Sequence, residues 1–200
     1  MDEMVLRGMA KWPDVPAVYG WLSLDRRGNW LIRDETVTSP TISAYIGRNY
    51  ERDSDGRWFF QNGPQRVFVR LDYTPLVYRI LDDGDELSIQ AHTGSAATSL
   101  SGAWIDESGC VLLDTELGVG VVHDHDLEKL VPAFIDAHRN ALEEERLDRL
   151  MQALQESEPA PLWLAIGRSN VKVDPVASSD VPRRFGFDPN PSPQNAVECT

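Results

Sequence analysis

The segment that most constrains how this chain can fold is residues 56–81, in which aromatic and β-branched side chains surround the pair Asn62-Gly63. Asn-Gly readily takes the positive backbone angles that a tight β-hairpin turn requires. After this turn, Val67, Val69 and Leu71 alternate with side chains of other types, which is the period of two expected for a strand with one drier face. The segment therefore predicts the core of a β-sheet.

Several other short segments predict strands, because they alternate in polarity and are bounded by turn residues. Asp25-Arg26-Arg27-Gly28 and Asp106-Glu107-Ser108-Gly109 are typical of hairpin connections in which glycine takes the left-handed position. The expected strands are 19–24, 29–33, 58–60, 67–72, 76–81, 87–91, 103–105, 110–114, 117–122, 162–166 and 170–173.

Two segments predict helices. Ser39 and Pro40 form an N-cap followed by proline at the first helical position, and a helix of about three turns follows. From Asp124 to Leu154, apolar residues recur at helical spacing, which predicts one long C-terminal helix kinked at Pro132. Residues 1–18, with two prolines, predict an extended arm rather than a helix.

The predicted fold class is α+β, with antiparallel β-sheets, one short helix and one long C-terminal helix. Residues 25–33 resemble residues 106–114, so either a duplicated hairpin–helix unit gives two lobes, or two hairpins have converged on the same turn. The expected domains are an N-terminal lobe at 1–81, a second lobe at 82–177, and an extended or disordered tail at 178–200.

The charge balance argues against two classes of partner. The 200-residue chain has 19 basic and 32 acidic residues, a formal net charge of −13, which repels nucleic acid and anionic membrane surfaces. The two cysteines, Cys110 and Cys199, are poorly placed for a structural disulfide, and we find neither an apolar leader nor a membrane-length apolar run. We therefore expect a cytoplasmic protein.

One cluster, His123-Asp124-His125-Asp126, resembles a metal site. On a strand, His123 and His125 would face the same side and could offer two nitrogens to a metal, with His92, His138 or carboxylates completing the set. The alternative is that an acidic residue at this strand-to-helix junction caps the helix. The sequence contains no nucleophile elbow or phosphate-binding glycine loop.

The central segment also offers a candidate ligand site, because aromatic platforms flanked by amides and arginines suit a small polar or anionic ligand. Burial of the aromatic residues in the core and a purely structural turn at Asn62 are the simpler alternative. The candidate ligand-binding residues are Trp58, Gln61, Asn62, Arg66, Phe68, Arg70 and Tyr73.

Two motifs carry a resemblance to a known family: RGMAKWPDVPAVYGWLSLDRRGNW at residues 7–30 and GRWFFQNGPQRVFVRLDYTP at residues 56–75, with a looser match at RRFGF, residues 183–187. Through them the chain resembles an uncharacterised family of proteobacterial proteins, a domain of unknown function. It is more distantly similar to another uncharacterised bacterial family of two-lobed α+β proteins. Neither resemblance implies any catalytic residue.

We therefore expect a non-enzymatic, regulatory module that binds a small molecule or a protein partner and needs no cofactor. The alternative is a metal-dependent hydrolase centred on His123 and His125. Homodimerisation through the long helix is a further possibility, because its apolar stripe shifts around the axis between Leu142 and Leu147.

Overall fold

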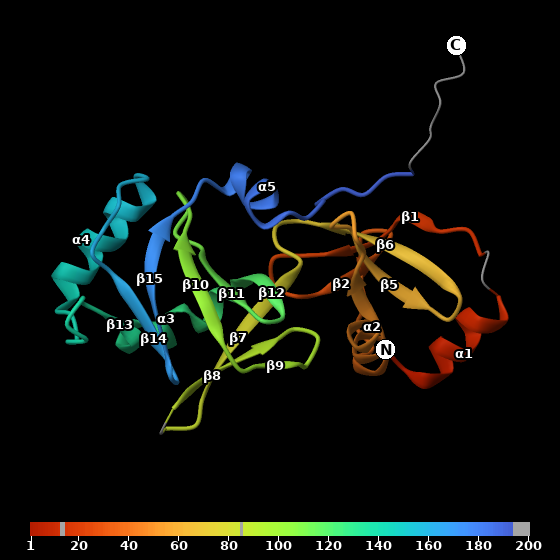
Figure 1. Ribbon diagram of the computed structural model, residues 1–200, viewed down its shortest axis with the longest axis horizontal. Coiled ribbons are helices and arrows are strands. Elements are labelled where there is room, and N and C mark those ends of the chain that lie inside the picture. Colours follow the sequence, from red (N-terminus) through yellow and green to blue (C-terminus); the bar gives the residue numbers. More distant parts are fainter. Residues whose placement is uncertain (13–14, 85, 194–200) are drawn as a thin grey trace, which may run out of the picture. The chain divides into compact units, whose positions relative to one another are not determined.

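A computed structural model describes residues 1–12, 15–84 and 86–193 of the chain (Figure 1). The chain folds into two compact units. The first unit contains residues 1–25, 29–75 and the segment that begins at Gly186; the second contains residues 26–28 and 76–185. The predicted division at residue 81 stays a prediction.

The first unit is built on a six-stranded sheet with the strand order β3-β2-β1-β6-β5-β4. The Asn62-Gly63 hairpin is confirmed at its centre: β5 and β6 are antiparallel, and Gly63 has a φ of 56°. The strands are β1 (Val18–Leu24), β2 (Trp30–Ile32), β3 (Glu35–Thr36), β4 (Tyr50–Arg52), β5 (Trp58–Asn62) and β6 (Gln65–Leu71).

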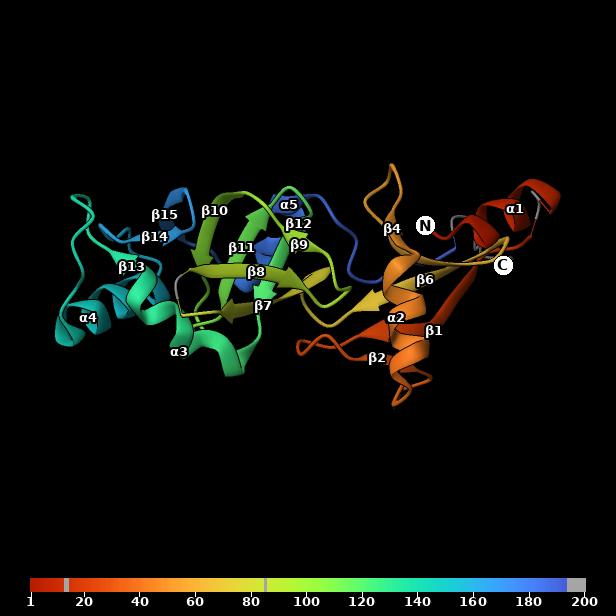
Figure 2. The same cartoon turned by 90° about the horizontal axis from the view of Figure 1, so that it is seen from below.

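One face of this sheet packs against helix α2 (Pro40–Arg48), as both views show (Figures 1 and 2). The predicted cap is confirmed, because the Ser39 hydroxyl accepts a hydrogen bond from the Ile42 N–H. Phe60 lies opposite Val67 in the ladder, and directly opposite residues share a face. We call the face that carries Phe60, Val67 and Leu22 the α2 face.

The opposite face carries Phe59, Gln61, Arg66 and Phe68, since Phe59 lies opposite Phe68 and Gln61 opposite Arg66. Helix α1 (Glu3–Lys11) lies at the turn end of the β5–β6 hairpin, with Gly8 close to Pro64, so we call this the α1 face. The prediction of an extended N-terminal arm is wrong here. Residues 3–11 precede both prolines, so the backbone can form a helix that buries Val5.

The second unit is built on a nine-stranded sheet with the order β13-β14-β15-β10-β11-β12-β7-β8-β9. The predicted hairpins at 103–114 and 162–173 are confirmed as antiparallel pairs. The strands are β7 (Leu76–Asp82), β8 (Leu87–Ala91), β9 (Ala96–Ala97), β10 (Leu100–Ile105), β11 (Val111–Thr115), β12 (Gly118–Val122), β13 (Phe134–Ile135), β14 (Trp163–Ile166) and β15 (Ser169–Pro175).

The predicted long C-terminal helix is wrong. The segment divides into the 3-10 turn η1 (Asp124–Asp126), α3 (Leu127–Leu130), the 3-10 turn η2 (Val131–Ala133), strand β13 and finally α4 (Glu144–Gln155). Pro132 lacks the N–H that an α-helix would need there, and the chain turns at residues 136–140. Apolar side chains that continue the helical period therefore belong to separate elements. The apolar stripe of one long helix, which motivated the expected homodimer, is therefore not present among the described residues.

The prediction of purely antiparallel sheets is also wrong. β1 pairs parallel with β6, β12 with β7, and β10 with β15. Each of these pairs joins strands that are distant in the chain. Short-range turn signals identify hairpins but carry no information about which distant strand lies next to a hairpin.

The turn at Asp25 and the turn at Asp106 share one geometry, which also occurs at Asp53 and Asp136. In each, the aspartate carboxylate accepts a hydrogen bond from the N–H four residues later, and the fourth turn residue has a positive φ. Glycine is that fourth residue in three of the turns, and Arg139 in the other. Turn chemistry alone therefore explains the likeness of residues 25–33 to 106–114, without a duplication.

The described part of the predicted tail is not extended throughout. Residues 178–180 form the 3-10 turn η3 and residues 181–185 form α5, after which Phe187 is buried in the first unit. Residues 194–200 of that predicted tail lie outside the described residues. None of the described helices is both long and apolar enough to cross a membrane.

Candidate functional site

The structure distributes the predicted ligand residues over different environments. Trp58 and Tyr73 are buried in the core, and Phe68 is buried beneath Tyr19, whose ring stacks on it with centroids 4.7 Å apart. Arg70 forms an exposed ion pair with Asp34 at 3.0 Å. The three remaining residues, Gln61, Asn62 and Arg66, each line a pocket of the first unit.

A pocket of about 530 Å³ lies on the α2 face. We call it the apolar pocket, because aliphatic and aromatic side chains form most of its wall and Asn62 and Gln65 supply its polar side chains. Strands β1, β2, β5 and β6 and helix α2 all contribute to it. It is lined by Val18, Trp21, Leu22, Ile32, Ile46, Phe60, Asn62, Gln65 and Val67.

Trp21 and Ile32 leave apolar surface in the open part of this pocket, with 49% and 44% of their area exposed. The Arg33 guanidinium lies over the Trp21 ring, 3.8 Å from its centroid. Arg33 and Asp34 both have positive φ, 51° and 65°, in the turn between β2 and β3. That backbone conformation is costly for residues other than glycine, and it holds a cation beside the pocket wall.

A second pocket, of about 440 Å³, lies on the α1 face. We call it the Gln61 pocket. Because side chains alternate along a strand, Gln61 and Asn62 point to opposite faces and belong to different pockets. The residues that line it are Met9, Trp12, Val15, Ala17, Gln61, Pro64 and Arg66.

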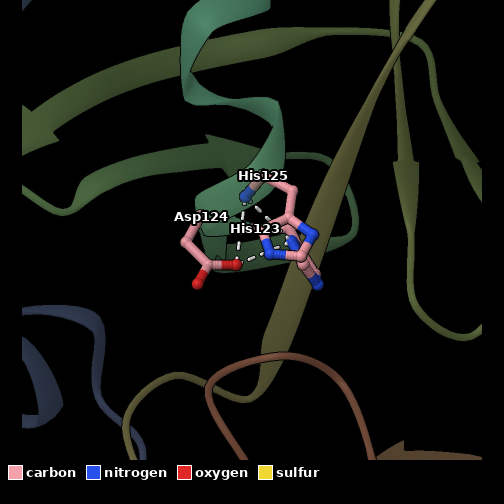
Figure 3. Close-up of side chains that lie close together, drawn as sticks. All are labelled: His123, Asp124 and His125. Atoms are coloured by element: carbon pink, nitrogen blue, oxygen red, sulfur yellow. Dashed lines mark hydrogen bonds and ion pairs between the residues drawn. The ribbon is translucent and has the colours of Figure 1, made fainter.

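The predicted metal cluster also forms a compact group (Figure 3). One ligand atom from each of His123, Asp124 and His125 lies within 4.8 Å of the others. Within the ranges that the structure describes, this is the group that could hold a metal, and His92 and His138 do not join it. The His125 backbone N–H donates to both His123 Nδ1, at 3.2 Å, and Asp124 Oδ1, at 3.0 Å.

These hydrogen bonds account for the closeness of the three residues without an ion, because two acceptors converge on one N–H at the start of η1. Burial lowers the pKa of His123, and the neutral ring can accept this hydrogen bond. The Arg27 guanidinium donates to Asp124 Oδ2 at 2.6 Å and lowers the pKa of that carboxyl. The N-cap of η1 is the His123 side chain, joined by Asp124 Oδ1, whereas Asp126, the N-cap of α3, makes no side-chain capping hydrogen bond. The prediction that an acidic residue caps this junction is therefore met only in part by Asp124.

Asp126, the last residue of the cluster, belongs to a different network. It is 1% exposed and accepts hydrogen bonds from Arg79 Nε at 2.5 Å, Lys129 Nζ at 2.7 Å and the Ile80 N–H at 3.1 Å. Burial alone would raise the pKa of Asp126, but these donors outweigh it and hold the pKa well below the usual range. This network ties α3 to strand β7.

Sequence reasoning missed the wall of the apolar pocket. Trp21 and Ile32 belong to a correctly predicted hairpin, and Ile46 to a correctly predicted helix. The local signal in the sequence was Gly20 next to Trp21, and in the structure Gly20 has a φ of 71° and Trp21 is exposed. The space itself depends on how α2 lies on the sheet, which no local pattern encodes.

The comparisons with known proteins place the chain in a family. A family model described as "Protein of unknown function (DUF2946)" matches residues 1–192. The chain belongs to this family. Membership assigns no activity to DUF2946 proteins, and no curated protein matches the chain.

Two solved structures are similar to this DUF2946 chain. One is a DUF1285 family protein from Silicibacter pomeroyi DSS-3, with a TM-score of 0.52 at 13% identity over 82% of this chain and 85% of that one. The other is a DUF1285 family protein from Shewanella baltica OS155, with a TM-score of 0.43 at 15% identity over 56% of this chain and 90% of that one. At such low identity, the first likeness supports the fold alone.

Proposed function

We propose that the chain is a non-enzymatic binding module whose ligand occupies the apolar pocket of the first unit. The observation that carries this proposal is the pocket itself. Its volume of about 530 Å³ lies within the roughly 300–1,000 Å³ of small-molecule sites. Such sites combine a mostly apolar wall with a few polar groups that orient the ligand, as this wall does with Asn62 and Gln65.

The charge beside the pocket supports a proposal for the class of ligand. Arg33 lies over Trp21 and has no ion-pair partner among the described residues, although the chain is strongly acidic. A cation held next to an apolar wall favours a ligand with an apolar body and an anionic end. We therefore propose a small amphipathic anion, with its body between α2 and the sheet and its anionic group towards Arg33.

Two fluorescent probes of nearly the same shape test this. 8-Anilinonaphthalene-1-sulfonate has the apolar body with an anionic group, and N-phenyl-1-naphthylamine has the same body without it. Both should bind, and Val67→Trp, which fills the pocket, should weaken both at least about tenfold. Val131→Trp is the matched control, because Val131 is 50% exposed and belongs to the second unit, so it does not line the pocket.

The Arg33→Gln variant distinguishes the contribution of the ligand's anionic group to affinity from that of its apolar body. This variant should weaken the sulfonate probe about fivefold, the effect of roughly 1 kcal/mol from one partly exposed charge interaction, and leave the uncharged probe unchanged. Circular dichroism and urea unfolding establish that each variant is folded. Equal binding of the probes to the parent protein and to Val67→Trp would exclude this pocket as the binding site.

A metal-dependent hydrolase remains the second candidate function, and the compact group of His123, Asp124 and His125 favours it. The capping hydrogen bonds and the Arg27 ion pair weigh against it, because they use the His123 Nδ1 lone pair and one lone pair or more on each Asp124 oxygen. Metal analysis of untagged protein incubated with zinc tests it. Less than a tenth of an equivalent bound would exclude a site, and stoichiometric zinc lost in His123→Ala would support one.

A further inference from the structure

The Gln61 pocket on the α1 face holds a buried acceptor that the protein leaves without a partner. Gln61 is 0% exposed, and its Nε2 donates to the Gly63 carbonyl at 2.9 Å. Its Oε1 accepts no hydrogen bond from any described residue. Buried side-chain carbonyl oxygens are nearly always satisfied, so an unpaired one that lines a pocket indicates a donor supplied from outside the protein.

Arg66 supplies the second recognition element of this pocket. It lies directly opposite Gln61 in the β5–β6 ladder, so both side chains are on the α1 face. Its guanidinium lies 4.7 Å from the centroid of the Phe59 ring, and no described carboxylate pairs with it. By contrast, Arg57 on the same face is neutralised by Asp53 and Asp55.

The rest of the wall is apolar. Met9, Trp12, Val15 and Pro64 surround the two polar side chains, and Trp12 is 58% exposed. A ligand there can place an apolar group against Trp12 and Met9 while its polar end reaches the sheet.

We propose that the Gln61 pocket binds a small 2-hydroxycarboxylate with an apolar side chain. The carboxylate pairs with Arg66, and the adjacent hydroxyl donates its hydrogen to Gln61 Oε1. An ammonium in place of the hydroxyl fits less well, because one neutral acceptor in a buried position leaves most of the charge uncompensated. This site is independent of the ligand proposed for the apolar pocket, which lies on the opposite face of the sheet.

Two probes that differ by one hydroxyl test this assignment by isothermal titration calorimetry. They are 3-phenyllactate and 3-phenylpropanoate, and phenylalanine serves as the ammonium analogue. The parent protein should bind 3-phenyllactate about tenfold more tightly than either of the others, because only its hydroxyl satisfies the buried oxygen without adding a charge.

Substitutions at Arg66 and Gln61 test the proposed contacts with the carboxylate and with the hydroxyl. Arg66→Gln should weaken 3-phenyllactate about tenfold or more. Arg70→Gln is the matched control, because Arg70 lies on the same strand and face but pairs with Asp34, and it should leave the affinity unchanged. Gln61→Met keeps the side-chain length and removes the acceptor, so the preference for 3-phenyllactate over 3-phenylpropanoate should disappear.

Three results would overturn the proposal: no binding of 3-phenyllactate, equal binding of it and 3-phenylpropanoate, or equal losses in Arg66→Gln and Arg70→Gln. Because Arg66 is exposed, its variant is expected to fold even if Gln61→Met does not. Val67→Trp should leave 3-phenyllactate binding intact, so a failure of this site is distinguishable from a failure of the apolar pocket.

Discussion

At the scale of single residues, Asp126 combines deep burial with a charge. Its donors come from strand β7 and helix α3, so the carboxylate joins elements that are distant in the chain. Arg79 and Lys129 are 45% and 39% exposed, which lets water stabilise them if the carboxylate is lost. The cost of losing Asp126 therefore comes mainly from its own buried hydrogen bonds.

Asp126→Asn should lower the free energy of unfolding by about 2 kcal/mol at pH 7, as expected for losing charge-assisted buried hydrogen bonds. Urea denaturation measures it. The control is Asp124→Asn, an exposed carboxylate that pairs with Arg27 and accepts a hydrogen bond from the His125 N–H, which should cause a much smaller loss. Equal losses in the two variants would contradict the assigned role of burial.

The stability of the parent protein and of Asp126→Asn should also differ with pH. The folded-state pKa of Asp126 lies below its unfolded value, so its contribution is fully present above the ordinary aspartate pKa of about 4. It is lost as the pH falls through the lower folded-state pKa. The difference in stability between the parent and Asp126→Asn should therefore be constant from pH 7 to pH 5 and shrink below pH 4.

At the scale of elements, the four aspartate turns show how local chemistry sets a hairpin. Asp136, like Asp53 and Asp106, accepts N–H bonds two and four residues ahead, and its fourth residue, Arg139, has a φ of 66°. In the turn at Asp106, Gly109 takes that position with a φ of 80°. A side chain there strains the backbone, whichever residue carries it.

Two substitutions test this as a pair. Arg139→Gly should raise the free energy of unfolding by about 0.5 kcal/mol, the relief of strain less the entropy that glycine adds to the unfolded chain. Gly109→Ala should lower it by about 1 kcal/mol, since the neighbour of its added Cβ is the flexible end of Gln155 and the cost is in the backbone. Thermal unfolding measures both, and a gain from Gly109→Ala would contradict the argument.

These turns also explain how much of the fold the sequence predicts. The β1–β2 and β5–β6 hairpins, the Ser39 cap and α2 depend on residues within a few positions of one another, and the sequence predicted each of them. The parallel pair of β1 and β6 was not, because its strands lie more than forty residues apart. The prediction of one long helix was wrong for a related reason. Apolar spacing shows which residues are buried, but not whether one element or several elements bury them.

At the scale of the whole molecule, the two pockets depend on space that exists only once the first unit has folded. The sequence grouped Gln61, Asn62 and Arg66 in one candidate ligand set, whereas in the structure Gln61 and Asn62 lie on opposite faces of β5 and line different pockets. It could not show that each face leaves a pocket, since Trp21 and Ile46 on one side and Met9 and Trp12 on the other come from distant segments. Trp58, Phe68 and Tyr73 were chosen for aromatic character, which in this fold serves the core.

The chain also returns to the first unit after completing the second. The Leu71 N–H donates to the Pro189 carbonyl at 2.8 Å, the Asp188 N–H donates to the Gly56 carbonyl at 3.1 Å, and Phe187 is 6% exposed. These contacts make a segment far along the sequence part of the unit that carries both proposed sites.

Phe187→Ala should therefore lower the free energy of unfolding by about 3 kcal/mol, the usual cost of removing a buried phenylalanine ring. Phe185→Ala is the matched control. Its ring is only half-buried and packs edge-on against Trp104 in the second unit, with centroids 4.9 Å apart, so its loss should be smaller. Urea unfolding of both variants, followed by circular dichroism, gives the comparison. If Phe185→Ala were the more damaging change, the return of residues 186–189 would contribute little to the stability of the first unit.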